Sequence, residues 1–303
     1  MKNKAMVAND IISMTYSKSV SYLALTKPRL LMLVVMTTLV GFLLAVRQDH
    51  QWLLMFHLLL GTTLLGGGAN SLNQWYEWAQ DSRMRRTAER PIPSGKLSRE
   101  QAWLFGVTIS VTGLLYLAMA VNSLTALLGF LSWGIYLFWY TPLKQKSVLN
   151  TWIGAITGAL PPVMGWTAVE NSMGTIALCS FGILYFWQLP HFFAISWLCR
   201  DDYQKGGFKM LSMGDNEGSA TAQQMLLNTL PLIVFSIIPY MTGFCGDSYM
   251  LTSIILGGIF LFGVGRFYYF RDNISARWVF IISIIYLPIL LSVMVVDRMP
   301  ILT

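Results

Sequence analysis

Charged residues are scarce in this sequence of 303 residues: Asp, Glu, Lys and Arg together make up 12%, whereas hydrophobic residues make up 55%. This composition excludes an ordinary soluble domain and indicates that a lipid bilayer is the solvent. Only three cysteines are present, Cys179, Cys199 and Cys245, and no metal-ligand spacing relates them. Residues 1–29 lack the charged start, short apolar core and small-residue cleavage site of a signal peptide, so the first apolar run is expected to remain.

Long apolar runs are the dominant positive feature. A run of about 17 to 25 such residues can cross a hydrocarbon core roughly 30 Å thick. We count nine runs and predict an all-α fold, a polytopic membrane bundle of nine transmembrane helices. The runs cover approximately residues 30–46, 52–72, 102–121, 124–140, 148–169, 175–198, 225–243, 249–265 and 278–296.

The basic residues predict the orientation. With nine alternating spans, nineteen of the 21 Lys and Arg residues fall on one side, and only Arg47 and Arg298 fall on the other. Positive loops stay in the cytoplasm. We therefore predict a multi-pass cell-membrane protein with a cytoplasmic N-terminal segment (1–29), a single transmembrane domain (30–296) and an outer C-terminal tail (297–303). The net charge of +7 is confined to loops beside spans, so it indicates topology and not nucleic-acid binding.

Two long interruptions, residues 73–101 and 199–224, break the apolar pattern on the predicted cytoplasmic side. They follow the second and sixth spans, with four spans between them. This layout predicts two related four-helix halves plus a ninth helix, with cytoplasmic cap loops over a shared central cavity.

The first interruption carries acids followed by bases. Asn73, Glu77 and Asp81 recur every four residues, so on a continuing helix they face one way. Magnesium takes oxygen ligands and commonly holds phosphates with one or two carboxylates. Arg86 and Arg90 follow, and guanidinium groups suit the phosphate oxygens that a metal leaves free. The alternative is a solvated loop whose arginines only reflect topology.

The second interruption repeats this order. Asp201 and Asp202 lie at the inner end of the sixth span and Lys205 follows. Alone, such a pair is commonly a helix end in water. However, this second cluster occupies the same position relative to its span as the first cluster does. The match favours a site in which both clusters bind metal ions and one diphosphate between the two halves.

His191 lies seven residues before Leu198, roughly 10 Å below the inner interface on a helix. An ionisable residue at this depth is a functional candidate, and neutral imidazole is a common ligand of haem iron. The alternative is a histidine hydrogen-bonded to a neighbouring helix.

Three segments carry a resemblance to a known family. Residues 70–95 resemble the first motif of the intramembrane (UbiA-type) prenyltransferase superfamily, in which an Asn and following acids precede RTxxRPxPSG. Segments 140–166 and 187–211 are similar to the YTxxLKR…GAxPPxxGW and WxxPHF…DDY…ML stretches of its haem-farnesylating branch. The chain departs from the first motif at Glu77, where an Asp is usual, and at Ala79, where another acid often stands, which leaves the exact metal ligation open.

The resemblance implies farnesyl transfer from farnesyl diphosphate to a vinyl group of protohaem IX (haem B), giving haem O for terminal oxidases, with magnesium as cofactor. It implies that Asn73, Glu77, Asp81, Asp201 and Asp202 are the catalytic metal ligands. The diphosphate is then bound by Arg86, Arg90 and Lys205, and the haem by His191. The implied partners are the two substrates and membrane lipid but no nucleic acid, and haem A synthase or an oxidase-assembly protein is a candidate partner.

Three rival functions would require different residues. A related membrane prenyltransferase acting on an aromatic quinone precursor would share both acidic clusters but not the PHF and GAxPPxxGW segments. A transporter would place its charges near the membrane midplane, whereas these lie at the edge. A non-catalytic haem carrier would need the histidine but not two acidic clusters.

Overall fold

The computed structural model describes residues 18–46 and 51–299. Arg47, the start of the predicted N-terminal segment (1–17) and the end of the predicted outer tail (300–303) lie outside these residues. Within them the chain is helical, with one isolated antiparallel bridge between Cys245 and Arg298. The predicted all-α class is confirmed.

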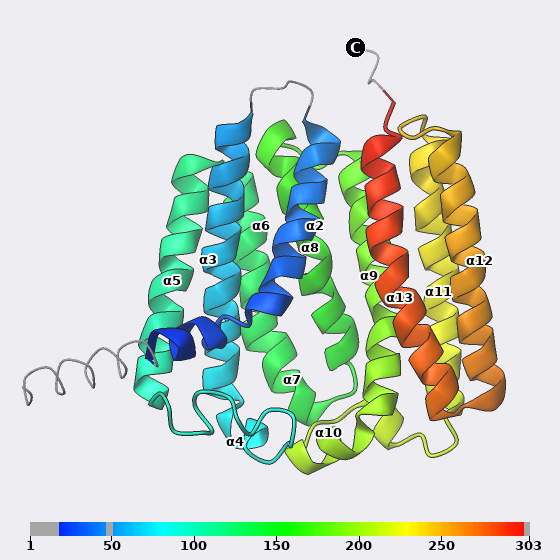
Figure 1. Cartoon of the computed structure of the whole chain (residues 1–303). Coiled ribbons are helices and arrows are strands. Elements are labelled where there is room, and N and C mark those ends of the chain that lie inside the picture. Colours follow the sequence, from blue (N-terminus) through cyan, green and yellow to red (C-terminus); the bar gives the residue numbers. More distant parts are fainter. Residues whose placement is uncertain (1–17, 47–50, 300–303) are drawn as a thin grey trace, which may run out of the picture.

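The helices form an upright bundle with a cap at one end (Figure 1). After a short helix over residues 18–25, the long helices are α2 (Pro28–Ala45), α3 (Trp52–Tyr76), α5 (Arg99–Ala120), α6 (Ser123–Gly134), α8 (Asn150–Glu170), α9 (Thr175–Leu198), α11 (Ser219–Met241), α12 (Asp247–Phe270) and α13 (Asn273–Val296). A π-helical segment, η1 (Ile135–Tyr140), joins α6 to α7 (Thr141–Lys146). Two short helices lie in the cap: α4 (Trp78–Asp81) follows α3, and α10 (Arg200–Gly206) follows α9. Both interruptions in the apolar pattern thus fold at the same end.

The predicted count of nine spans is not confirmed. Eight helical stretches of the described chain, with Ser123–Lys146 counted as one, are long and apolar enough to cross a membrane. Helix α8 has 21 residues but is not among them. It packs against α2, α6 and α9, and most of its residues are buried. Because other helices surround it, α8 can carry Asn150, Thr151 and Thr157 without exposing them to lipid.

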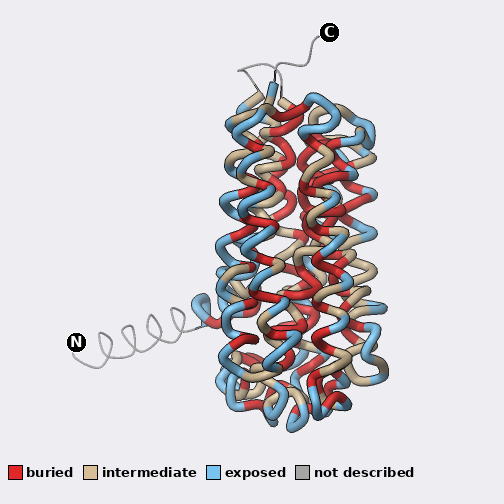
Figure 2. Tube along the Cα trace, turned by 90° about the vertical axis from the view of Figure 1, so that its right-hand side faces the viewer, coloured by how far each residue is buried: buried red, intermediate tan, exposed pale blue. Residues whose placement is uncertain are grey.

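The outer surface of the bundle is apolar. Large hydrophobic side chains are exposed along it, including Leu53, Met119 and Phe262, and the exposed positions turn outward along the helices in Figure 2. In water such a surface would aggregate, whereas lipid solvates it. The molecule is therefore a multi-pass membrane protein.

Small residues let α2 and α8 approach closely. A Cβ at Gly41 would overlap the carbonyl of Pro162, and one at Gly165 would overlap the carbonyl of Thr38. Glycine at such crossings permits backbone contact between membrane helices. The contact packs α2 along α8 and beside α3, and Lys27, which precedes α2, reaches Asn73 near the end of α3.

Candidate functional site

A cavity of about 450 Å³ lies between α2, α3, α6, η1 and α8, with α9 and the cap completing its wall. Its lining changes character with depth. Charged side chains gather at the cap: Lys27, Glu77, Asp81, Arg86, Arg90 and Lys144. Deeper in the bundle the lining is mostly apolar and includes Val34, Leu65, Trp133, Pro161 and Met164. The volume lies within the range of small-molecule sites.

The predicted acidic stripe is present. Helix α3 ends at Tyr76, but Glu77 donates its backbone N–H to Asn73 O at 2.9 Å and Asp81 donates to Glu77 O at 2.8 Å. The four-residue spacing therefore persists across the break between α3 and α4. Asn73, Glu77 and Asp81 are all buried. Glu77 and Asp81 line the cavity, whereas Asn73 does not.

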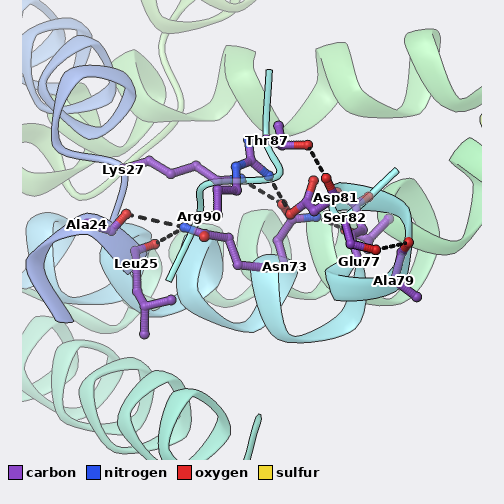
Figure 3. A network of polar contacts seen from close by, with 12 residues as sticks. Ala24, Leu25, Lys27, Asn73, Glu77, Ala79, Asp81, Ser82, Thr87 and Arg90 are labelled. Carbon is purple, nitrogen blue, oxygen red and sulfur yellow. Dashed lines mark hydrogen bonds and ion pairs between the residues drawn. The ribbon is translucent and has the colours of Figure 1, made fainter. Parts of the chain in front are cut away.

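Each member of the stripe has a cationic partner. Arg90 Nη1 lies 2.7 Å from Asp81 Oδ2, and Lys144 Nζ lies 2.9 Å from Glu77 Oε1. The Asn73 side chain accepts a hydrogen bond of 2.7 Å from Lys27 Nζ, as Figure 3 shows together with the Arg90 contact. Arg90 was predicted at this site.

Two of these cations were missed as partners of the stripe. From sequence, Lys27 and Lys144 are only two of the nineteen basic residues on the predicted cytoplasmic side. Only folding brings them to α3, because they lie 46 and 67 residues from their partners. The sequence does place Lys27 at the membrane edge, since it directly precedes Pro28 and the first apolar run, but it does not indicate which residue Lys27 contacts.

Burial shifts the pKa values of the groups in the cap. It raises the pKa of the Asp81 carboxyl, although Arg90 acts in the opposite direction. Burial and, to a smaller extent, the positive charges of Arg90 and Lys144 together lower the pKa of Lys27 to about 7. With two carboxylates facing four cationic side chains, the charged end of the cavity favours an anionic ligand.

The residues fit a magnesium ion. Asp81 Oδ1 is buried and has no hydrogen-bond partner within the described chain, so one carboxylate oxygen is available for a cation. No group of three or more His, Cys, Asp or Glu residues that could hold a metal occurs among the described residues. Magnesium does not need one, since one or two carboxylates and substrate phosphates commonly hold it.

Arg86 connects the two halves of the cap. Its guanidinium lies over the Tyr203 ring of α10, 5.3 Å from the centroid, and both residues line the cavity. Burial acts to lower the pKa of Arg86, but Tyr203 and Asp202 raise it overall. Helices α4 and α10 are in contact, so folding brings the two interruptions together.

The second acidic cluster is less enclosed than the first. Asp201 and Lys205 are exposed on α10, and Asp202 is partly buried. None of the three lines the cavity, although Tyr203 between them does. Their assignment to metal and diphosphate stays a prediction.

His191 lies on the side of α9 that packs against α13. Its Nδ1 is 2.7 Å from Ser283 Oγ, and its ring stacks between Trp187 and Phe280. The Ser283 hydroxyl donates to Phe280 O at 2.6 Å, so it accepts from His191 and places the imidazole proton on Nδ1. This tautomer leaves the Nε2 lone pair for a ligand. His191 does not line the cavity, and its role toward haem stays a prediction.

A helical membrane bundle that joins carboxylates and cations to an apolar cavity defines a class: a membrane enzyme that acts on an anionic ligand with a long apolar tail. A family model described as "UbiA prenyltransferase family" matches residues 34–287. The chain belongs to the UbiA prenyltransferase family.

One protein of similar sequence and two solved structures match this chain over most of its length. A protein of Opitutus terrae named "Protoheme IX farnesyltransferase" is 42% identical over 285 residues, covering 93% of this chain and 96% of the relative. A solved structure concerning digeranylgeranylglyceryl phosphate synthase in membranes matches with a TM-score of 0.80 at 15% identity, covering 92% of this chain and 98% of the other. A UbiA homolog from Archaeoglobus fulgidus, bound to GPP and Mg2+, matches with a TM-score of 0.66 at 16% identity, covering 90% and 99%. The two structures support the fold.

Proposed function

We propose that this protein transfers the farnesyl group of farnesyl diphosphate to a vinyl group of protohaem IX, giving haem O. The observation that carries the prenyl-transfer step is the polarity of the cavity, with charged groups at the cap and an apolar interior. The acceptor rests on similarity to the protein of Opitutus terrae over nearly the whole length of both chains.

In the proposed reaction the C–O bond between farnesyl C1 and the diphosphate breaks, and the bonding electrons leave with the diphosphate. The haem vinyl group forms the new C–C bond to C1. Water adds to the resulting cation on the porphyrin side and loses a proton, which leaves a hydroxyl. The atoms balance without an oxidant.

The residues of the cap act on the leaving group. Asn73, Glu77 and Asp81 would hold magnesium, and Asp201 and Asp202 on α10 would be its further ligands. When bound, the ion would offset the negative charge of the leaving diphosphate. Arg86, Arg90 and Lys205 donate to its oxygens, and Lys27 and Lys144 add positive charge at the same end. Preorganised cations of this kind stabilise a transition state because they need no rearrangement as charge develops.

The apolar interior of the cavity protects the farnesyl cation, which is the other product of C–O bond cleavage. An allylic cation is quenched by water, so it needs a dry enclosure. Trp133, Tyr136, Tyr140 and Phe192 line the cavity, and aromatic faces attract cations. The apolar lining of the cavity excludes water from the rest of the farnesyl chain.

The haem is assigned to His191 through Nε2, with Ser283 holding the tautomer. Haem is far bulkier than a linear prenyl chain, so the cavity takes the prenyl diphosphate and the porphyrin approaches from beside it. The N-terminus is proposed to be cytoplasmic and the C-terminus outside the cell membrane, with 30–296 as the single prenyltransferase domain. Partnership with haem A synthase or an oxidase-assembly protein stays a prediction.

The test is product formation. Membranes containing the protein are incubated with protohaem, farnesyl diphosphate and magnesium, and pigments are separated and weighed by mass spectrometry. The proposal expects a magnesium-dependent farnesyl-hydroxyethyl haem. Folded protein that makes no such product but prenylates an aromatic quinone precursor would instead identify the rival prenyltransferase.

A further inference from the structure

The deep end of the cavity is enclosed by three residues from three helices. Leu65 on α3 and Met164 on α8 are both nearly fully buried and both line the cavity, as does Gly129 on α6. A Cβ built at Gly129 would lie 2.9 Å from Leu65 Cδ2 and 3.1 Å from Met164 Cε. We call Leu65, Gly129 and Met164 the floor.

The bundle is packed tightly behind the floor. Leu117 on α5 is fully buried, and its Cδ1 would be 3.4 Å from a Cβ at Gly129. On the other side, the backbone contact between α2 and α8 at Gly41 and Gly165 closes the gap between those helices. A chain that reaches the floor therefore meets packed side chains and not a continuing channel.

The depth of the cavity matches one particular chain. Glu77 at the charged end and Leu65 in the floor both line the cavity. They are twelve residues apart along α3 and its continuation, a distance of about 18 Å at the rise of an α-helix, which has to hold the first phosphate as well as the prenyl chain. Carbon–carbon bonds of about 1.5 Å give the twelve-carbon main chain of a farnesyl group an extended length of roughly 15 Å. A geranyl chain would leave the floor unfilled, and a geranylgeranyl chain would overrun it.

We propose that Leu65, Gly129 and Met164 set the length of the prenyl chain that the protein accepts, so that it selects a fifteen-carbon donor. This inference rests on the proposed prenyl-transfer function but not on the identity of the acceptor. Gly129 keeps the cavity deep because it has no side chain. A larger residue at this position would push Leu65 and Met164 into the cavity and shorten it. Leu65 and Met164 limit how deep the cavity extends.

Binding of three prenyl diphosphates to the full-length protein tests the inference. Geranyl, farnesyl and geranylgeranyl diphosphates compete with labelled farnesyl diphosphate in the presence of magnesium and without haem. The inference expects the wild type to prefer farnesyl over geranylgeranyl diphosphate by about tenfold or more, since one methylene group too many or too few in an apolar pocket already costs 10- to 200-fold.

Two variants shift the preference in opposite directions. Leu65→Ala combined with Met164→Ala removes about as many heavy atoms as one isoprene unit contains, so geranylgeranyl diphosphate is expected to gain about tenfold relative to farnesyl. Gly129→Val raises the floor, and geranyl diphosphate is expected to bind best. Gly129→Ala and the single Met164→Ala are milder versions that give smaller shifts in the same directions if the stronger variants do not fold.

Matched controls come from buried positions that do not line the cavity: Leu58→Ala on α3, Met225→Ala on α11 and Gly257→Ala on α12. They are expected to keep the wild-type order of chain lengths. Equal binding of all three chains by the wild type, or an unchanged order in every folded floor variant, would overturn the inference while leaving prenyl transfer intact. Clear chain-length selection without haem prenylation would uphold it and overturn only the proposed acceptor.

Discussion

The α3–α4 region and the α9–α10 region carry the same sequence pattern, yet they differ in structure. In the first, Asn73, Glu77 and Asp81 are buried and each has a cationic partner. In the second, Asp201 is exposed and none of the acids lines the cavity. From this comparison we propose that α3–α4 is a preformed diphosphate site, whereas α9–α10 forms a more open side and binds the acceptor through His191.

The largest expected loss of activity comes from a substitution in the α3–α4 region. Asp81→Asn keeps the shape of the side chain but removes the charge and the free oxygen at Oδ1, so kcat/KM is expected to fall about 10²- to 10³-fold. The readout is prenylated haem formed at saturating magnesium. Asp272→Asn is the control, because Asp272 caps α13 away from the cavity and Asn caps a helix equally well. Full turnover by Asp81→Asn would refute the preformed site.

Prediction from sequence succeeded where periodicity carries the information. The spacing of Asn73, Glu77 and Asp81 predicted one stripe, and the structure keeps it even though α3 ends between the first two. Likewise, the apolar runs predicted the helices of the bundle. Helix α8 is the exception: its apolar character is weak because neighbouring helices and not lipid surround it, so the criterion that found the other spans does not confirm it.

Prediction failed where contacts join distant parts of the chain. No local pattern indicates that Lys27 reaches Asn73 or that Lys144 pairs with Glu77. The same is true of Ser283, which is 92 residues from the His191 ring that it orients. The similar positions of the two acidic clusters in the sequence also gave no sign that they differ in burial.

The next-largest effect is expected on haem affinity, at His191 and its partner Ser283. Ser283→Ala removes the hydrogen-bond partner of His191 Nδ1, and loss of such a partner typically lowers metal affinity by 10- to 100-fold. His191→Ala is expected to lower haem affinity at least as much, and both variants should bind farnesyl diphosphate normally. The absorption spectrum of bound protohaem is the measurement.

A rescue and a control separate ligand orientation from packing. Ser283→Thr keeps the hydroxyl and should restore the wild-type haem spectrum. Ser253→Ala removes a buried hydroxyl whose hydrogen bonds in the described structure go to Met250 on the same helix, α12, and it should leave the spectrum unchanged. Normal haem affinity and spectrum in His191→Ala would show that the histidine only joins α9 to α13.

A smaller effect is expected at the open acidic cluster. Asp202→Asn should raise the magnesium concentration for half-maximal activity by roughly fivefold, because an interaction of a partly exposed charge contributes at most about 1 kcal/mol. Magnesium titration of turnover is the measurement, compared directly with Asp81→Asn. If Asp202→Asn costs as much as Asp81→Asn, the two clusters are equivalent and the proposed difference between α3–α4 and α9–α10 is wrong.

The smallest effect concerns pH. Since the pKa of Lys27 is lowered to about 7, its ammonium group is mostly protonated below pH 7 and mostly neutral above it in the free protein. Affinity for the anionic diphosphate is therefore expected to fall as pH rises through 7, by a few-fold. Lys27→Gln should weaken binding at pH 6 and flatten this decline, whereas Lys96→Gln, which changes an exposed lysine of the same cap, should retain it.

The most direct test of the central claim is an experimental structure of the full-length protein with magnesium and a non-hydrolysable farnesyl diphosphate analogue. The account predicts a metal ion on Asp81 Oδ1, the diphosphate among Arg86, Arg90 and Lys144, and the end of the farnesyl chain against Met164. A diphosphate bound elsewhere, with the Asp81 to Arg90 and Glu77 to Lys144 pairs unchanged and the cavity empty, would contradict it.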